Sequence, residues 1–246
     1  HGIHLSGAAE AFKQLYEKTG IPVLTTWNSL DLIPYEHPLC AGRPGSVALR
    51  PANFAAQNCD LLISIGARLD NVVTAHNPQN FAQYADKVIV DIDASELKKH
   101  QLPKARLIQA DAKTFIEQLN TELPELRADY SAWINKIADW KQRYPRCDGE
   151  MFPEQGEISH YHFIDRLSAL TKANELIITG SSGLAVEVFY STFVNKPGQR
   201  IFLTSGLGSM GYGLPAAIGG CLASGKKPVV SVEGDGSLQL NLQELS

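Results

Sequence analysis

The chain has 246 residues, of which 44% are hydrophobic and 20% are charged, and its formal net charge is -4. These values are typical of a globular protein and exclude a disordered chain or a fibre. The slight negative charge gives no reason to expect a nucleic-acid partner. No apolar run approaches the roughly 20 residues of a membrane span, so we expect no membrane partner. The 4 cysteines are widely spaced and lack metal or redox spacing, which predicts a reduced, cytoplasmic protein.

Helices and strands alternate along the first half of the chain. Apolar spacing predicts a helix over 6–19, capped by Ser6, and a strand over 21–26. Further helices are predicted over 51–58 and 112–119, and strands over 61–65, 88–92 and 106–109. Such continuous apolar strands are typical of a parallel sheet buried on both faces.

The pattern changes after residue 125. A helix is predicted over 129–144, and Pro145 to Glu157 is the best candidate linker because it is rich in proline, glycine and charge. A second series follows, with helices over 160–171, 184–192 and 214–223 and strands over 176–179, 200–203 and 229–232. We therefore predict an α/β fold of two Rossmann-like units, with mostly parallel sheets flanked by helices. The units cover 1–125 and 158–246, and 126–157 forms a helix and linker between them.

The two ends of the sequence indicate a piece of a longer protein. The chain starts at His1 without an initiator methionine, and Ser246 lies inside what reads as a helix. Gly2-Ile3-His4-Leu5-Ser6-Gly7 is similar to a strand-to-helix turn whose strand would lie upstream. We expect the second unit to be incomplete as well.

The strongest chemical signal is Glu233-Gly234-Asp235-Gly236-Ser237, directly after the last predicted strand. Ligands of open α/β sheets bind at the carboxyl ends of strands, and Gly234 and Gly236 let a ligand approach the backbone closely. Ser237 can cap a following helix whose N–H groups would face an anion, and Asp235 offers a hard oxygen for Mg²⁺. The segment predicts a diphosphate–metal site. The alternative is an ordinary glycine turn with a capping aspartate.

A second glycine-rich segment, 204–217, lies one helix upstream. Five of its residues are typical of backbone that turns tightly or lies close to another group: Gly206, Gly208, Gly211, Gly213 and Pro215. Met210 stands alone among the glycines and would project as an apolar wedge. The alternative is that the glycines permit close helix packing and that Met210 fills a gap.

Together the two segments resemble the diphosphate-binding domain of thiamine-diphosphate enzymes, most closely the acetolactate synthase-like group of 2-oxo-acid enzymes. The family motif begins with Gly-Asp-Gly and ends with an asparagine a few dozen residues later. This chain has the beginning, followed by 238–245 much as in acetolactate synthases, and it stops before the closing asparagine. The resemblance implies thiamine diphosphate and Mg²⁺ as cofactors.

The resemblance also implies a role for each residue of the two segments. Asp235 would be the Mg²⁺ ligand, and three neighbours would meet the diphosphate: Gly234, Gly236 and Ser237. The Gly208 carbonyl and the Met210 amide would meet the aminopyrimidine, with Ser209 between them. The Met210 side chain would hold the cofactor in its bent shape.

A third segment follows the strand 176–179. By its place, Gly180-Ser181-Ser182-Gly183 matches the family's first diphosphate loop, with Ser181 and Ser182 as candidate binding residues. Acetolactate synthases carry a Gln-His pair in this loop, so the sequence departs from them here. A capped helix start is an equal alternative.

The first unit resembles the family's central domain over nearly its whole length. Three segments are close to the family pattern: Glu36–Leu39, Asp60–Asp70 and Val90–Asp93. In acetolactate synthases this domain holds FAD, and a dinucleotide could lie at the strand ends that carry Gly66, Arg68, Asp91 and Asp111. We favour a structural role, in which Arg68 pairs with a carboxylate and Asp91 caps a turn. The segment 41–46 also departs from the synthase sequence, so FAD is the less favoured interpretation.

By resemblance, the parent enzyme would bind a 2-oxo acid such as pyruvate, release CO₂ and act as a transferase or lyase in a homo-dimer or tetramer. Family enzymes activate the cofactor with a glutamate on a separate pyrimidine-binding domain, which is absent here. The positions of Glu187, Glu233 and Glu244 do not allow them to replace it, and none of the 7 histidines is assigned a role. We therefore name no catalytic residue and expect the isolated chain to be inactive.

Two other functions remain open. A nucleotide-binding Rossmann-type oxidoreductase would share the α/β units, and Gly206–Gly211 has the literal Gly-x-Gly-x-x-Gly spacing. We judge that this segment lacks the βαβ context and a ribose-binding carboxylate about 20 residues further on. The second alternative is a non-catalytic binding module that kept the fold.

Overall fold

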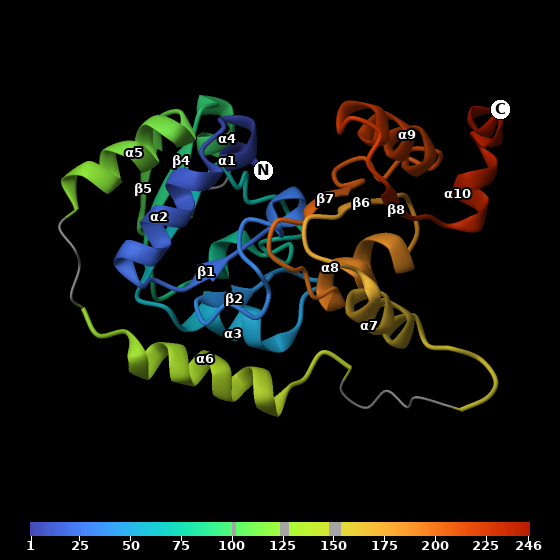
Figure 1. The fold of residues 1–246 in the computed structure, drawn as a ribbon. Coiled ribbons are helices and arrows are strands. Elements are labelled where there is room, and N and C mark those ends of the chain that lie inside the picture. The colour runs from blue at the N-terminus through green and yellow to red at the C-terminus, as the bar shows by residue number, and fades with distance from the viewer. Residues whose placement is uncertain (100–101, 124–127, 148–153) are drawn as a thin grey trace. The chain divides into compact units, whose positions relative to one another are not determined.

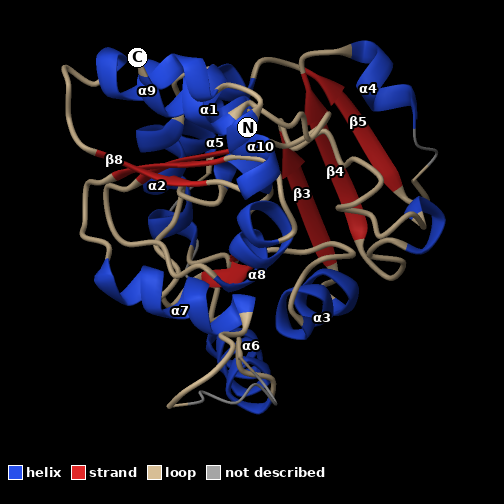
Figure 2. Cartoon of the chain, turned by 90° about the vertical axis from the view of Figure 1, so that its right-hand side faces the viewer, coloured by secondary structure: helices blue, strands red, loops and turns tan. Residues whose placement is uncertain are grey.

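The computed structural model describes residues 1–99, 102–123, 128–147 and 154–246. The chain forms two compact units, His1–Ile33 with His37–Tyr144, and Pro34–Glu36 with Pro145–Ser246. Both units contain parallel sheets flanked by helices, which confirms the predicted α/β fold class (Figures 1 and 2). Residues 148–153 of the predicted linker and residues 124–127, around the predicted boundary at 125, lie outside the described residues.

The first unit is built on the parallel sheet β3-β4-β5, whose strands point the same way in Figure 2. These strands are β3 (Leu61–Ile65), β4 (Asp86–Asp91) and β5 (Ala105–Gln109). A second parallel pair joins β1 (Val23–Leu24) to β2 (Cys40–Gly42). β1 is shorter than the strand predicted over 21–26. β2 was not predicted, because Cys-Ala-Gly carries no β-branched or aromatic residue.

The helices of the first unit are α1 (Gly2–Leu5), α2 (Ala9–Thr19), α3 (Arg50–Asn58), α4 (Ala94–Lys99), α5 (Ala112–Glu122) and α6 (Ser131–Arg143), with 3₁₀ turns η1 (Trp27–Ser29) and η2 (Pro78–Asn80). The prediction that Ser6 caps a helix over 6–19 is wrong. Ser6 closes α1 instead, and its Oγ donates a hydrogen bond to Ile3 O at 3.1 Å. α4 escaped prediction because it is short and buries only Leu97.

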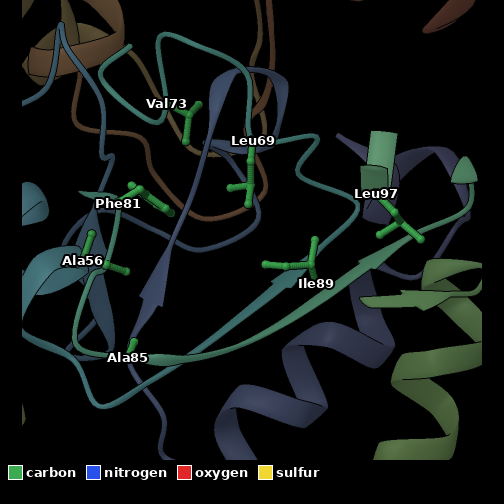
Figure 3. Close-up of a cluster of buried hydrophobic side chains, with 8 residues drawn as sticks. Ala56, Leu69, Val73, Phe81, Ala85, Ile89 and Leu97 are labelled. Atoms are coloured by element: carbon green, nitrogen blue, oxygen red, sulfur yellow. The ribbon is translucent and has the colours of Figure 1, made fainter. Parts of the chain in front are cut away.

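The two faces of β3-β4-β5 are covered to different extents. One face packs against a buried cluster drawn in Figure 3: Ala56, Leu69, Val73, Phe81, Ala82, Ala85, Ile89 and Leu97. On the other face, Ile65 packs against a cluster from α1, α2 and α5. Leu61 and Ile63 point to that same face and are 49% and 40% exposed. The expected burial on both faces is therefore wrong for β3, because in the described part of the chain the cluster from α1, α2 and α5 packs against Ile65 at its carboxyl end.

The second unit is a parallel sheet in the order β7-β6-β8. Its strands are β6 (Leu176–Thr179), β7 (Arg200–Leu203) and β8 (Val229–Val232), each with the bounds that the sequence predicted. The helical elements are α7 (His160–Leu170), the π-helical turn η3 (Leu184–Val188), α8 (Phe189–Thr192), α9 (Gly213–Ala223), α10 (Asp235–Gln239) and the 3₁₀ turn η4 (Leu242–Leu245). α9 covers one face of the sheet, and α7 and α8 cover the other (Figure 1).

The strands of the second unit end level with one another. Thr179, the last residue of β6, lies opposite Leu203 of β7 and Val232 of β8. The loops that follow the three strands therefore leave the sheet at one edge. No helix in the described part of the chain has both the length and the apolar character to cross a membrane.

Candidate functional site

The carboxyl edge of β7-β6-β8 gathers the three segments that the sequence singles out. Residues 180–183 follow β6, 204–212 follow β7, and 233–237 continue β8 into α10. Hydrogen bonds join the loops to one another, since Ser181 Oγ donates to Gly208 O at 2.7 Å. The structure thus brings the predicted site residues into one region of one unit.

The loops after β6 and β8 touch at Gly234. A Cβ at Gly234 would lie 2.9 Å from Ser182 Cβ and 3.1 Å from Ser181 O. The first distance is shorter than any normal carbon–carbon contact, and the second is tight, so an added Cβ would force one of the two loops to shift. Gly234 is therefore needed for the close approach of the two loops, and it leaves bare backbone at this edge.

Met210 joins the two glycine-rich segments. Its side chain is 55% exposed, which contradicts the alternative in which it fills a gap. A Cβ at Gly236 would lie 3.5 Å from Met210 Cε, so the tip of the side chain lies beside the Gly-Asp-Gly turn. Gly206 and Gly208 have φ of +87° and +61°, and a Cβ added at either would meet no atom within 4 Å, so backbone conformation rather than helix packing accounts for them.

Two expectations about the start of α10 are wrong. Gly234 is the N-cap, without a side-chain cap, and the exposed Asp235 is the first helical residue, so Asp235 is not a capping aspartate. Ser237 lies inside the helix rather than before it, because the helix begins earlier than predicted. Ser237 is 2% exposed, and its Oγ accepts a hydrogen bond from Gly211 N at 2.8 Å. Asn241 Nδ2 donates to Gly211 O at 2.6 Å, which fixes the same residue from the other side.

The serines after β6 are engaged with protein groups. Ser182 Oγ accepts a hydrogen bond from Ala185 N at 3.0 Å, at the start of η3, whose N-cap Gly183 has no side-chain cap. Ser181 N donates to Glu233 Oε1 at 2.9 Å, and its hydroxyl donates to Gly208 O. Both donors of Ser181 therefore hold neighbouring loops.

Sequence reasoning gave no role to Glu233, yet its carboxylate contacts the loop after β6, the turn after β8 and the start of α9. Oε1 accepts hydrogen bonds from Ser181 N and from Gly234 N at 3.2 Å. The carboxylate lies against Gly180 and Gly213, where a Cβ would come within 1.8 Å of one of its oxygens. A charged residue between an apolar strand and a glycine turn was the only signal for this in the sequence.

Charged side chains at the carboxyl edge of β3-β4-β5 bind their own neighbours. Arg68 Nε lies 3.0 Å from Glu96 Oε1, and Asp91 Oδ1 accepts a hydrogen bond from Asp93 N at 3.0 Å. These contacts confirm the structural roles that the sequence favours for Arg68 and Asp91. Asp111 likewise caps α5 through hydrogen bonds from two backbone N–H groups. Hydrogen bonds from the backbone and side chain of Ser95 lower the pKa of the exposed Asp93.

Family models match both parts of the chain. The model for the thiamine pyrophosphate enzyme central domain matches residues 1–119. The model for the thiamine pyrophosphate enzyme C-terminal TPP binding domain matches residues 179–246, which include all three loops of the edge. The chain belongs to the thiamine pyrophosphate enzyme family. Thiamine pyrophosphate is the same compound as thiamine diphosphate, so the resemblance stated from the motifs is confirmed.

Relatives of this family align over nearly the whole chain. The acetolactate synthase isozyme 1 large subunit of Escherichia coli (strain K12) is 36% identical over 95% of this chain and 40% of its own length. The probable chloroplastic acetolactate synthase 2 of Oryza sativa subsp. japonica is 34% identical over 98% of this chain and 36% of its own length. The acetolactate synthase large subunit of Lactococcus lactis subsp. lactis (strain IL1403) is 32% identical over 100% and 41%. The chain thus spans about two fifths of the length of these relatives.

The Gly-x-Gly-x-x-Gly spacing of Gly206–Gly211 can be compared with a dinucleotide site. Gly206–Gly211 lies between the strand β7 and the helix α9. Glu233 follows it by about 20 residues, at the end of β8. The prediction that this segment lacks a βαβ context and a following carboxylate is therefore wrong. In a dinucleotide site that acid would face the ribose, whereas Glu233 is bonded inward to Ser181 and Gly234. β6 also separates β7 from β8 in the sheet. The geometry therefore gives the oxidoreductase alternative no support.

Proposed function

We propose that the carboxyl edge of β7-β6-β8 binds thiamine diphosphate with Mg²⁺, in an enzyme that acts on a 2-oxo acid. The observation that carries the proposal is that the tip of the Met210 side chain lies beside the Gly-Asp-Gly turn, since a Cβ added at Gly236 would lie 3.5 Å from Met210 Cε. This proximity places the two glycine-rich segments, each typical of this cofactor, side by side. The match of the TPP-binding domain model to residues 179–246 supports the same assignment.

The residues present fit the diphosphate and its metal. Gly234 and Gly236 leave bare backbone at the start of α10, where N–H groups favour an anion. Asp235 is exposed beside them and supplies a carboxylate oxygen. Within the described ranges, no three His, Cys, Asp or Glu side chains gather to hold a metal ion by themselves. A lone carboxylate suits Mg²⁺ when phosphate oxygens and waters complete its shell, which is the usual way this ion is held.

The loop after β7 is assigned to the aminopyrimidine end. Gly208 O accepts one hydrogen bond from Ser181 and keeps a second lone pair for a ligand. The Met210 amide follows Ser209, and the exposed Met210 side chain offers an apolar support. When bound, thiamine diphosphate supplies an electron sink for bond cleavage next to a carbonyl group. The part of this chain is to bind the cofactor and to orient it.

The acetolactate synthase relatives support a transferase or lyase reaction. As the resemblance to the family implies, we propose pyruvate or a related 2-oxo acid as the substrate and a homo-dimer or tetramer as the assembly. All 4 cysteines are free thiols, which supports a reducing, cytoplasmic location. Neither family match falls on a pyrimidine-binding domain, to which the resemblance assigns the activating glutamate. We therefore propose that a polypeptide of these 246 residues does not turn over pyruvate by itself.

FAD has less support than thiamine diphosphate. The side chains that could meet a dinucleotide in the first unit already bind protein groups. Arg68 pairs with Glu96, Asp91 accepts a hydrogen bond from Asp93 N, and Asp111 caps α5. We propose that these residues stabilise the unit and that cofactor chemistry belongs to the second unit.

Calorimetric titration of the protein with thiamine diphosphate in the presence of Mg²⁺ tests the proposal. Asp235→Ala is expected to weaken binding at least about tenfold, because it removes the charged ligand of the metal. Asp93→Ala removes an exposed carboxylate from the other sheet and is expected to leave binding unchanged. Equal affinity of wild type and Asp235→Ala would remove Asp235 as the metal ligand. Turnover of pyruvate by the 246-residue polypeptide with both cofactors would contradict its proposed inactivity.

A further inference from the structure

Glu233 places its carboxylate between the loop after β6, the turn after β8 and the start of α9. Oε1 accepts hydrogen bonds from Ser181 N at 2.9 Å and from Gly234 N at 3.2 Å. Oε2 is fully buried, and within the described part of the chain it has no hydrogen-bond partner. Burying a carboxylate with an unpaired oxygen costs free energy, whereas an apolar side chain would fill the same space without that cost. The presence of a carboxylate here therefore needs a reason beyond packing.

Two glycines make room for this carboxylate. A Cβ at Gly180 would lie 1.8 Å from Glu233 Oε1, and a Cβ at Gly213 would lie 1.8 Å from Oε2. Gly213 is the first residue of α9, so the partial positive charge of that helix end lies beside the anion and stabilises it. The loop after β6, the end of β8 and the start of α9 are thus built around one side chain.

Ser181 extends this hold to the loop after β7. Its N–H is bound by Glu233, and its Oγ donates to Gly208 O at 2.7 Å. Gly208 belongs to the segment assigned to the aminopyrimidine, and Gly234 belongs to the turn assigned to the diphosphate. One carboxylate therefore fixes backbone at both ends of the proposed cofactor site.

We propose that Glu233 is a positioning residue, which holds the loops after β6, β7 and β8 in the arrangement that accepts thiamine diphosphate. This inference rests on the proposed function of the same edge. Glu233 acts through Ser181 and Gly234 and does not itself touch the ligand. Its loss is expected to loosen the loops before the ligand binds, so that ligand binding must order them.

The test compares Glu233→Ala and Glu233→Gln with wild type in calorimetric titrations with thiamine diphosphate and Mg²⁺. Glu233→Ala is expected to weaken binding about tenfold, because two hydrogen bonds to a charged acceptor are lost. Glu233→Gln keeps an acceptor oxygen of the same reach and is expected to stay within about threefold of wild type. Hydrogen exchange provides the second measurement, and Glu233→Ala is expected to speed exchange in 180–183 and 204–210.

Glu175→Ala is the matched control. Glu175 Oε2 also accepts a backbone hydrogen bond, from Lys172 N at 2.8 Å, but it lies before β6 at the opposite end of the strand. Its loss is expected to lower the melting temperature without changing cofactor affinity or exchange in the loops. If Glu233→Ala does not fold, Glu233→Asp takes its place, because its shorter side chain cannot reach both N–H groups.

Each outcome decides the question. Wild-type affinity in Glu233→Ala or Glu233→Asp, with Asp235→Ala weakened, would overturn the positioning role and leave the proposed function standing. Loss of affinity in Glu233→Gln equal to that in Glu233→Ala would also overturn it. If Asp235→Ala and Glu233→Ala both bind like wild type, the proposed function fails as well.

Discussion

The carboxyl edges of the two parallel sheets are built from similar elements but use their polar groups differently. At β3-β4-β5, Arg68 pairs with Glu96, and Asp91 binds the N–H of Asp93. At β7-β6-β8, the Gly-Asp-Gly turn offers bare backbone, and the Met210 side chain is 55% exposed. The carboxyl ends of parallel strands form an edge where ligands can bind, and both units have such an edge. A ligand can bind there only if the edge is not already filled by side chains bonded to one another.

Hydrogen bonds join separate loops at both edges. In the first unit Trp27 donates to Asp70, and Asp111 caps α5. In the second unit Ser181 joins Gly208 and Gly211 joins Ser237. Because the glycine turn and the exposed Met210 lie at the second edge, substitutions at the first edge should change stability, and substitutions at the second edge should change ligand affinity.

The largest expected effect is that of Gly234→Ala. Gly234 has φ -77° and ψ 145°, which alanine adopts freely, so the added Cβ acts only through its contacts with Ser181 and Ser182. Overpacking of this kind costs about 1–3 kcal/mol, and we expect affinity for thiamine diphosphate to fall about tenfold or more in calorimetry. Gly219→Ala is the control, because Gly219 lies inside α9 and its Cβ would meet no atom within 4 Å outside the helix's own backbone. Equal affinity of the two variants would contradict the close approach at Gly234.

The second prediction concerns Asp70, at the first edge. Its Oδ2 accepts a hydrogen bond from Trp27 Nε1 at 2.7 Å, and its Oδ1 accepts from Val72 N and Val73 N at 2.9 and 3.0 Å. Asp70→Ala is expected to destabilise the first unit by about 2 kcal/mol, because it leaves these donors without their charged acceptor.

Urea unfolding followed by tryptophan fluorescence measures this loss selectively. The chain has 3 tryptophans, at positions 27, 133 and 140, and all lie in the first unit. Thiamine diphosphate affinity in Asp70→Ala should match wild type when it is measured without denaturant. A loss of affinity comparable to that in Gly234→Ala would erase the contrast between the two edges.

Local sequence patterns predicted the strands of the second unit correctly, but they placed some helix starts and contacts wrongly. β6, β7 and β8 were predicted with their observed bounds, because each is a short apolar run that ends at a polar or glycine-containing turn. The fold class and the meeting of the three loops follow from that parallel arrangement. The errors at Ser6 and Ser237 concern helix starts, where a shift of a few residues changes a cap into an interior position.

Local sequence patterns could not predict the role of Glu233, for a different reason. Ser181 and Glu233 are 52 residues apart in the sequence, and their hydrogen bond exists only because β6 and β8 pair. The space for the carboxylate comes from Gly180 and Gly213, which the sequence suggests only as loop and packing glycines. Long-range contacts of this kind need the register of the sheet, which composition and spacing do not supply.

The smallest expected effect tests a buried charge of the first unit, Lys87, as the counterpart of Glu233. Lys87 is 1% exposed, and its Nζ donates to Ala85 O at 3.1 Å and to Pro103 O at 2.9 Å. Burial, assisted by the nearby positive charge of Lys104, lowers the pKa of Lys87 below its usual 10.5. Between the lowered pKa and 10.5 the unfolded chain binds more protons than the folded chain, so folding stability should rise with pH across that window.

Lys87→Met removes this dependence. The free energy of unfolding of wild type minus that of Lys87→Met should therefore increase as the pH is raised toward 10.5. Thiamine diphosphate affinity should not change in Lys87→Met, because the Lys87 ammonium is bonded to two carbonyls of its own unit, whereas the Glu233 carboxylate holds loops of the proposed binding edge. A change in affinity in Lys87→Met without a change in the pH slope would show that the first unit takes part in cofactor binding, and the contrast between the two edges would then fail.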